Sequence, residues 1–462
     1  MIKKEEIDQK QARSEIKTIP VPFALEEIKG NISITLNTPS KPYKEQIINQ
    51  AFKFHSQGNI TEAAKYYQLF INQGFKDHRV FSNYGIVLRD LGKLKEAEIT
   101  IRNAIELNPN FADAYSNLGN ILQDLGNLKD AESSQRKAIE LQPDFAEAYN
   151  NLGTIFKSLG NLKEAEIFFS KALALKPDFT LALMNRGQLF FDKNEFDKAL
   201  YDSDACNTKE SRAFSLETLY ALERTGEIYQ RIKKTAKLDE KNIRLAAFSS
   251  FISEREKKDT ANNFCRNPLS LLHISNLKLH VQDYKKFIKE IIHELAYIEP
   301  IWEPPKKATH NGFQTPKHIN LFKNSPQAIS YLKSIILKEL DSYYLKYEKE
   351  SCSYIQKWPC NKNLFAWYVI LKKQGYQEAH IHTSGWLSGV IYLKVVPPLD
   401  KDEGAIELSL NGANYSDINS PQLTHQPNLG DILLFPSSLH HRTIPFSTDT
   451  ERIVLAFDLK PS

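Results

Sequence analysis

A strict internal period is the feature of this chain that most constrains its fold. The words LGKLKEAE, LGNLKDAE and LGNLKEAE begin at residues 91, 125 and 159, so consecutive copies stand 34 residues apart. Weaker copies extend the series at Gly58 and at Asn194. A unit of this length forms two helices and cannot bury its apolar face alone, so neighbouring units must stack. The period therefore predicts an all-α solenoid over 43–214.

Small residues keep the same phase as the repeated words. They are Gly85, Gly119, Gly153 and Gly187 in the first helix of each unit, and Ala97, Ala131, Ala165 and Ala199 in the second. Such residues let two helices approach closely, and a proline breaks one unit from the next at Pro109, Pro143 and Pro177. A 34-residue helix pair of this kind is the tetratricopeptide repeat. About five repeats fit the segment.

Four asparagines occupy one position of the repeat, two residues before the glycine of the first helix: Asn83, Asn117, Asn151 and Asn185. In this they resemble the asparagine ladder in the repeat domain of O-GlcNAc transferase, where the amides hold the backbone of an extended peptide. A primary amide both donates and accepts hydrogen bonds, so a row of amides can bind any main chain. The resemblance implies a peptide-binding groove. The alternative is a solvated polar face of the helix.

The pattern changes along the rest of the chain. Residues 1–42 show no periodicity, and we expect them to be loosely ordered. Residues 215–266 remain helical but lose the 34-residue phase, which indicates a helical connector. Beyond residue 267, helical stretches give way to short strand-like runs separated by glycine, proline and asparagine. This texture predicts a mostly antiparallel sandwich or barrel over 267–462.

The last strand-like run, RIVLAFDL, has two unlike faces. Its residues 453, 455 and 457 are bulky and apolar, whereas Arg452, Val454 and Ala456 share the opposite face. Small side chains leave room for a ligand, and the arginine at the start of this face could bind one. We therefore expect this face to line a ligand-binding pocket.

Histidines lie beside two of the strand-like runs. His380 and His382 stand two apart just ahead of LSGVIYL, and residues i and i+2 of a strand point to one face. His440 and His441 follow GDILLFPSSL, and Arg452 comes eleven residues after His441. Imidazoles that reach one point from two strands are suited to bind a metal ion. The residues therefore predict a metal centre. Against it stands the alternative of structural histidines and a chance HH pair.

These words and their order resemble the 2-oxoglutarate- and Fe(II)-dependent oxygenases of the double-stranded β-helix (jelly-roll) fold. A bacterial and phage branch of them is often fused to tetratricopeptide repeats. HIHTSGWLSGVIYL, GAIEL and GDILLFPSSLHHRTIPFSTDTERIVLAFDL carry the resemblance, most specifically over 363–459. It implies that His380 and His441 bind Fe(II). It also implies that Arg452 binds the distal carboxylate of 2-oxoglutarate and that Tyr392 hydrogen-bonds the same carboxylate.

The chain departs from this family at the third metal ligand. The usual facial triad has two histidines and one carboxylate, but His382 stands where Asp or Glu is expected. Three arrangements stay open: His382 binds the metal; the iron keeps two histidines and a water, as in the resembling aspartyl/asparaginyl β-hydroxylases; or a distant acid such as Glu403 or Glu407 binds it. We expect His382 to bind, because the strand spacing already directs it. The resemblance also favours His441 over His440.

The leading functional hypothesis is an enzyme, a 2-oxoglutarate/Fe(II)-dependent dioxygenase. It would hydroxylate a protein or peptide recruited by the repeats, with ascorbate as a possible reductant in the assay. Two alternatives come from other classes. One is a non-catalytic repeat scaffold with a structural or degenerate metal site. The other is a zinc hydrolase, because three histidines also suit Zn(II) with an open water position.

Charge and composition bear on partners and location. Lys and Arg number 60 against 56 Asp and Glu, and the net charge of +4 is too small to indicate nucleic acid or a membrane surface as partner. The opening MIKKEEIDQKQARSEIK lacks the apolar region of a secretory signal. The four cysteines include no CxxC pair, so we expect free thiols and a cytoplasmic location.

Overall fold

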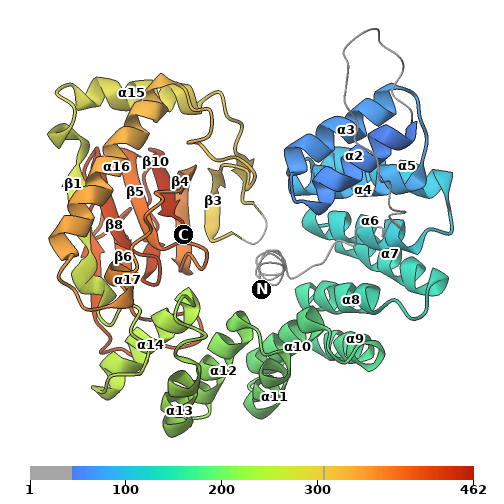
Figure 1. The fold of residues 1–462 in the computed structure, drawn as a ribbon, viewed down its shortest axis with the longest axis horizontal. Coiled ribbons are helices and arrows are strands. Elements are labelled where there is room, and N and C mark those ends of the chain that lie inside the picture. Colours follow the sequence, from blue (N-terminus) through green and yellow to red (C-terminus); the bar gives the residue numbers. More distant parts are fainter. Residues whose placement is uncertain (1–43, 305–306, 462) are drawn as a thin grey trace. The chain divides into compact units, whose positions relative to one another are not determined.

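The computed structural model describes residues 44–304 and 307–461, and the chain divides into two compact units, Met1–Cys206 and Asn207–Ser462 (Figure 1). The predicted loosely ordered segment 1–42 lies outside the described residues. Within the described residues, no helix is long and apolar enough to cross a lipid bilayer.

The first unit is a row of helix pairs. They are α2 (Lys44–Ser56) with α3 (Ile60–Asn72), α4 (His78–Asp90) with α5 (Leu94–Leu107), α6 (Ala112–Asp124) with α7 (Leu128–Leu141), α8 (Ala146–Ser158) with α9 (Leu162–Leu175), and α10 (Thr180–Asp192) with α11 (Phe196–Cys206). A Cβ atom on Gly153 would lie 2.5 Å from the ring of Phe169 on the paired helix, so glycine is required for this close approach. The predicted tetratricopeptide solenoid is confirmed.

The second unit starts with helices and continues into a sheet. The helices are α12 (Lys209–Ala221), α13 (Thr225–Thr235), α14 (Ile243–Glu256), α15 (Tyr284–Leu295), α16 (Gln327–Tyr347) and α17 (Ser353–Gln356), with short 3-10 turns η1 (Pro268–Leu271) and η2 (Leu277–Leu279). The strands are β1 (His273–Asn276), β2 (Ile301–Trp302), β3 (Thr309–Gln314), β4 (Leu364–His380), β5 (Leu387–Lys394), β6 (Ile406–Ser409), β7 (Gln422–His425), β8 (Asp431–Pro436), β9 (His440–Thr443) and β10 (Arg452–Leu459).

The sheet is antiparallel and curled. Its strands follow the order β1-β8-β5-β10-β4-β9-β6-β7, with β2 and β3 attached to β4. Strand β4 is 17 residues long and changes partner along its length: its first half pairs with β10 and its end pairs with β9. Residues 372–375 of β4 bulge opposite Asn311 of β3, and a bulge of this kind bends a strand. The predicted jelly-roll-like class is confirmed, and the bend turns the end of β4 toward β9.

The core of this unit lies between the sheet and its helices. Long helix α16 lies across one face of the sheet (Figure 1), and its Leu332, Ile336 and Leu340 belong to the same buried cluster as Leu455 and Phe457 of β10. Side chains alternate along β10, so Arg452, Val454 and Ala456 point away from this core and line a pocket. The packing of one face of β10 against the core therefore places the residues of its opposite face along the pocket.

Candidate metal centre

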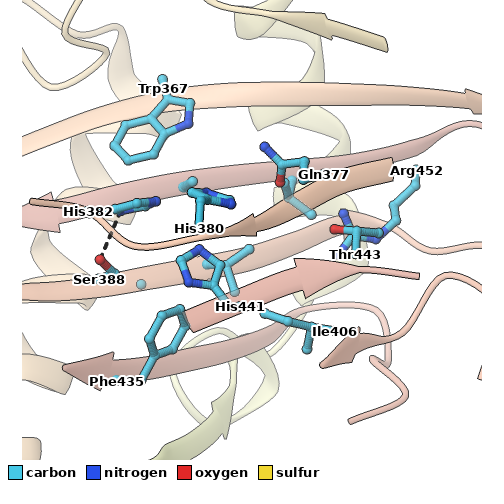
Figure 2. A pocket seen from close by; sticks show the side chains of 14 residues that line it. Trp367, Gln377, His380, His382, Ser388, Ile406, Phe435, His441, Thr443 and Arg452 are labelled. Atoms are coloured by element: carbon cyan, nitrogen blue, oxygen red, sulfur yellow. Dashed lines mark hydrogen bonds between the residues drawn. The ribbon is translucent and has the colours of Figure 1, made fainter. Parts of the chain in front are cut away.

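Three histidines come together where the end of β4 meets β9. The Cα atoms of His380 and His441 are direct partners across these strands, and His382 follows two residues beyond. One ring nitrogen from each of the three lies within 4.8 Å of the others. The ring centroids are 4.3 Å apart for His380 and His441, and 4.9 Å apart for His382 and His441. Figure 2 shows the three imidazoles grouped in one pocket, and a group of this kind could hold a single metal ion.

Two of the imidazoles are fixed by backbone carbonyl groups. Nδ1 of His380 lies 2.7 Å from the carbonyl oxygen of Glu378, and Nδ1 of His441 lies 3.2 Å from that of Leu439. A carbonyl oxygen can only accept, so each Nδ1 must carry the proton. The Nε2 lone pair of each ring is therefore free, and it is the atom that can bind a metal.

The third imidazole is fixed by a buried carboxylate. Nδ1 of His382 lies 2.6 Å from Oδ1 of Asp458 and 2.9 Å from the Ser388 hydroxyl, which itself donates to Asp458. Burial alone would raise the pKa of Asp458, but the neighbouring His382 and Lys460 hold that pKa below its ordinary value. Asp458 is therefore an acceptor, and it leaves Nε2 of His382 free as well.

Burial keeps two histidines of the cluster, His380 and His441, neutral. It lowers the pKa of His380 to about 3 and, with the neighbouring His380 and His382 adding to the effect, lowers that of His441 well below its ordinary value. A neutral imidazole is the form that binds a metal ion. At neutral pH the rings of His380 and His441 therefore need not lose a proton before they can act as ligands.

A buried arginine completes the pocket. Arg452 is 2% exposed, and its guanidinium carbon lies 4.9 Å from the centre of the Tyr392 ring. Among the described residues no carboxylate pairs with it, and the Tyr392 side chain is its one polar neighbour, which leaves the Nε atom of Arg452 unsatisfied. Burial lowers the pKa of Arg452, yet from so high a value that the group stays charged at neutral pH. An unpaired buried cation is costly, so this site fits an anionic group.

The same pocket holds both the histidines and the arginine. Figure 2 shows Arg452 reaching in from β10 beyond Gln377 and Thr443, set off from the imidazoles. Trp367 and Phe435 line the pocket on the histidine side. A ligand with a metal-binding end and a distant carboxylate matches this division of the pocket.

The other sequence candidates for a metal ligand lie elsewhere. His440 is next to Tyr415, with ring centroids 5.8 Å apart, because neighbouring residues of β9 point to opposite faces. Glu407 binds Arg442 through two hydrogen bonds of 2.8 Å, and Glu403 accepts from the Ser447 hydroxyl at 2.7 Å. In the described part of the chain, neither glutamate joins the group of potential ligands.

Sequence reasoning did not identify Asp458. The signal was present in RIVLAFDL, because period-two alternation puts Asp458 on the same face as Arg452 and Ala456. The signal was incomplete, because only the pairing of distant segments places His382, 76 residues away in sequence, against this carboxylate.

The four repeat asparagines are buried between helices. Asn83, Asn117, Asn151 and Asn185 are 1%, 0%, 1% and 8% exposed. The Nδ2 groups of Asn117 and Asn151 donate to a serine hydroxyl of the preceding repeat at 3.2 Å, and that of Asn185 donates to Asn150 at 2.9 Å. These three amides therefore join successive repeats. Their burial argues against a direct contact with a peptide, which stays a prediction.

Comparisons with known proteins agree with the two halves of the chain. Residues 365–458 match the family described as "Putative 2OG-Fe(II) oxygenase", residues 110–178 match "Tetratricopeptide repeat", and residues 85–126 match "TPR repeat". The chain thus combines tetratricopeptide repeats with a domain that matches a 2-oxoglutarate–Fe(II) oxygenase family. No curated protein matches the chain.

Three solved structures are similar to part of this chain. A thermophilic TPR protein of Thermus thermophilus is 16% identical, with 38% of this chain and 99% of that chain covered and a TM-score of 0.35. Pseudomonas aeruginosa pilF is 16% identical, with 44% and 96% covered and a TM-score of 0.38. A tetratricopeptide repeat protein of Parabacteroides merdae is 18% identical, with 55% and 97% covered and a TM-score of 0.39.

Proposed function

We propose that this protein is a 2-oxoglutarate- and Fe(II)-dependent dioxygenase that hydroxylates a protein or peptide recruited by its repeats. The observation that carries the proposal is the pairing of two features in one pocket: three imidazoles with free Nε2 atoms, and an unpaired buried guanidinium. The match of residues 365–458 to the oxygenase family supports the same reading.

Each residue of the pocket has a role in this proposal. His380, His382 and His441 would hold Fe(II) through their Nε2 atoms. Arg452 would bind the distal carboxylate of 2-oxoglutarate in a charge-assisted pair, and the Tyr392 hydroxyl would donate to the same group. Fe(II) and 2-oxoglutarate, when bound, supply the oxidation of a substrate C–H bond by dioxygen with release of succinate and carbon dioxide. Trp367 and Phe435 would exclude water from the histidine side.

The test is turnover of 2-oxoglutarate by the full chain. Purified protein is incubated with Fe(II), 2-oxoglutarate and ascorbate, and succinate is measured without added substrate. We expect slow succinate formation that depends on Fe(II) and is lost in His441→Ala. A protein that binds Fe(II) but neither binds nor consumes 2-oxoglutarate would contradict the proposal and favour the scaffold hypothesis.

A zinc hydrolase is the second candidate, because three neutral histidines suit Zn(II). It accounts less well for the pocket. No carboxylate that could act as a general base is among the described residues that line it, and a hydrolase gives the buried Arg452 no evident task. Calorimetry separates the two candidates: 2-oxoglutarate should bind to the Fe(II) or Co(II) form, whereas a hydrolase has no use for it.

The repeats support a macromolecular substrate, since tetratricopeptide solenoids generally bind proteins. This role does not require the buried asparagines to form the contact surface. Substrate trapping from lysate with the full chain, followed by mass spectrometry for one added oxygen atom, would identify the substrate. The four free cysteines favour a reducing compartment, and we include a cytoplasmic location in the proposal.

A further inference from the structure

The carboxylate of Asp458 lies beside His382, the residue that stands in place of the expected carboxylate ligand. His382 occupies the position where the resembling oxygenases carry Asp or Glu, and Oδ1 of Asp458 lies 2.6 Å behind its ring, at Nδ1. Asp458 is 4% exposed. Its Oδ1 also accepts from the Ser388 hydroxyl at 2.9 Å, and its Oδ2 faces the Lys460 ammonium group at 3.3 Å.

We infer that Asp458 is the positioning residue that makes His382 the third metal ligand of this centre. The inference rests on the proposed function only in requiring that the cluster binds a metal. A carboxylate accepts hydrogen bonds and donates none, so it holds the proton of His382 on Nδ1 and keeps Nε2 free. His382 and Asp458 thus act as a donor–acceptor pair, and that pair stands in place of a directly bound carboxylate.

The surroundings of the pair hold it in one geometry. The Ser388 hydroxyl lies 2.8 Å from that of Ser437, and the Ser437 carbonyl accepts from the backbone N–H of His382 at 3.2 Å. A Cβ atom on Gly385 would lie 2.5 Å from the Ser437 hydroxyl and 3.1 Å from the Asp458 carboxyl group. The segment after His382 therefore fits tightly against the carboxylate, and the ring has little freedom to turn away.

Removing the charge of Asp458 should reverse the polarity of the pair. In Asp458→Asn the Lys460 ammonium, which only donates, retains the amide oxygen at the Oδ2 position, so the NH₂ group faces His382. An NH₂ group only donates, so it favours the tautomer in which Nδ1 accepts and the proton lies on Nε2. That tautomer cannot bind a metal through Nε2, the atom that faces the cluster. The same substitution beside a catalytic histidine is known to leave the geometry intact while trapping the wrong tautomer.

A second variant tests the polarity directly. In His382→Asp the introduced carboxylate faces Asp458, so two acceptors meet in a buried site and the donor is lost. In the double variant His382→Asp/Asp458→Asn the amide donates to the introduced carboxylate, and the common arrangement of two histidines and one carboxylate is restored. The double variant should therefore bind metal better than either single variant, although each single change is harmful.

The experiment measures metal affinity of the full chain by calorimetry with Co(II). We expect Asp458→Asn to lose about 10- to 100-fold in affinity, His382→Asp to lose at least as much, and the double variant to recover at least about 10-fold over His382→Asp. The matched control is Asp431→Asn, which alters a buried carboxylate that accepts from another imidazole, His425, at 3.0 Å. It should leave Co(II) affinity within about threefold of wild type.

NMR of ¹⁵N-labelled histidine detects which ring nitrogen carries the proton. A purely structural role of Asp458 would not change that position. The NMR spectrum should report the proton of His382 on Nδ1 in the wild type and on Nε2 in Asp458→Asn. Wild-type affinity in Asp458→Asn, or a double variant no better than His382→Asp, would overturn the inference while the metal centre stands. A wild-type chain that binds no Co(II) or Fe(II) would instead overturn the proposed function together with this inference.

Discussion

His380 and His441 lie directly opposite each other on antiparallel strands, with ring centroids 4.3 Å apart. This contact exists because β4 bends at residues 372–375 and its end then pairs with β9. His440, the neighbour of His441, points to the other face of β9 and lies against Tyr415. Two adjacent histidines thus have different surroundings, and substitutions can separate their roles.

We predict that His441→Ala abolishes Fe(II) binding, whereas His440→Ala weakens it far less. The first change removes one of the three potential ligand atoms, and the second removes a ring that is absent from the group. Metal content after anaerobic loading is the measurement, with thermal unfolding as a check on folding. Equal losses in the two variants, or full retention in His441→Ala, would contradict the ligand assignment.

Arg452→Ala should raise the 2-oxoglutarate concentration required for binding by about one to three orders of magnitude and leave the metal in place. A charge-assisted pair in a desolvated pocket contributes about 2–4 kcal/mol, which corresponds to that range. The matched control is Arg442→Ala, since Arg442 pairs with Glu407 on the exposed side of the same region. Calorimetry with the Co(II) form measures both. If the affinity for 2-oxoglutarate is unchanged in Arg452→Ala, the cosubstrate does not bind at Arg452.

The solenoid, and the face of β10 that lines the pocket, could both be predicted from the sequence for the same physical reason. Helix pairs and strand faces depend on residues that are near one another in the chain, so the 34-residue period predicts the repeats, and alternation places Arg452, Val454 and Ala456 on one wall. The partner of His382 was not accessible, because Asp458 reaches it only through the pairing of β10 with β4 and β5. The pattern likewise cannot tell whether a polar residue of a repeat faces solvent or the next repeat.

A buried glutamate away from the metal centre predicts a dependence of stability on pH. Glu339 of α16 accepts hydrogen bonds from His273 of β1 and from His280. Burial opposes ionisation of Glu339, but these two partners outweigh it and lower its pKa to about 2. A carboxyl group whose pKa is lower in the folded state stabilises the fold above its unfolded pKa of about 4.5, and the contribution is lost as the pH falls toward about 2.

Glu339→Gln should therefore lower the free energy of unfolding at pH 7 by on the order of 3 kcal/mol. The difference from wild type should shrink progressively as the pH falls below about 4.5. Asp341→Asn is the control, because Asp341 lies on the same helix but forms an exposed ion pair with Lys362 and should change stability little. Urea unfolding of both variants at several pH values is the measurement. If the difference in unfolding free energy between Glu339→Gln and wild type stays constant as the pH falls toward about 2, ionisation of Glu339 is not its cause.

The last prediction concerns the asparagines of the repeats, which have two possible roles. If they bind a peptide backbone, replacing Asn117, Asn151 and Asn185 together by Ala should reduce hydroxylation of the native substrate and leave stability unchanged. If they join the repeats, as their burial and hydrogen bonds indicate, the same variant should lose about 1 kcal/mol for each bond and unfold at lower temperature.

We expect the second result. Each amide donates to a side chain of the preceding repeat, so its removal leaves a buried polar partner without a donor. The control is a triple variant of exposed residues that share one repeat position, Lys95→Ala, Lys129→Ala and Lys163→Ala, which leaves the packing between repeats intact. Circular dichroism during heating measures stability, and succinate formation without substrate reports on the metal domain. An unfolding temperature equal to that of the control, combined with selective loss of substrate turnover, would restore the peptide-binding role to these asparagines.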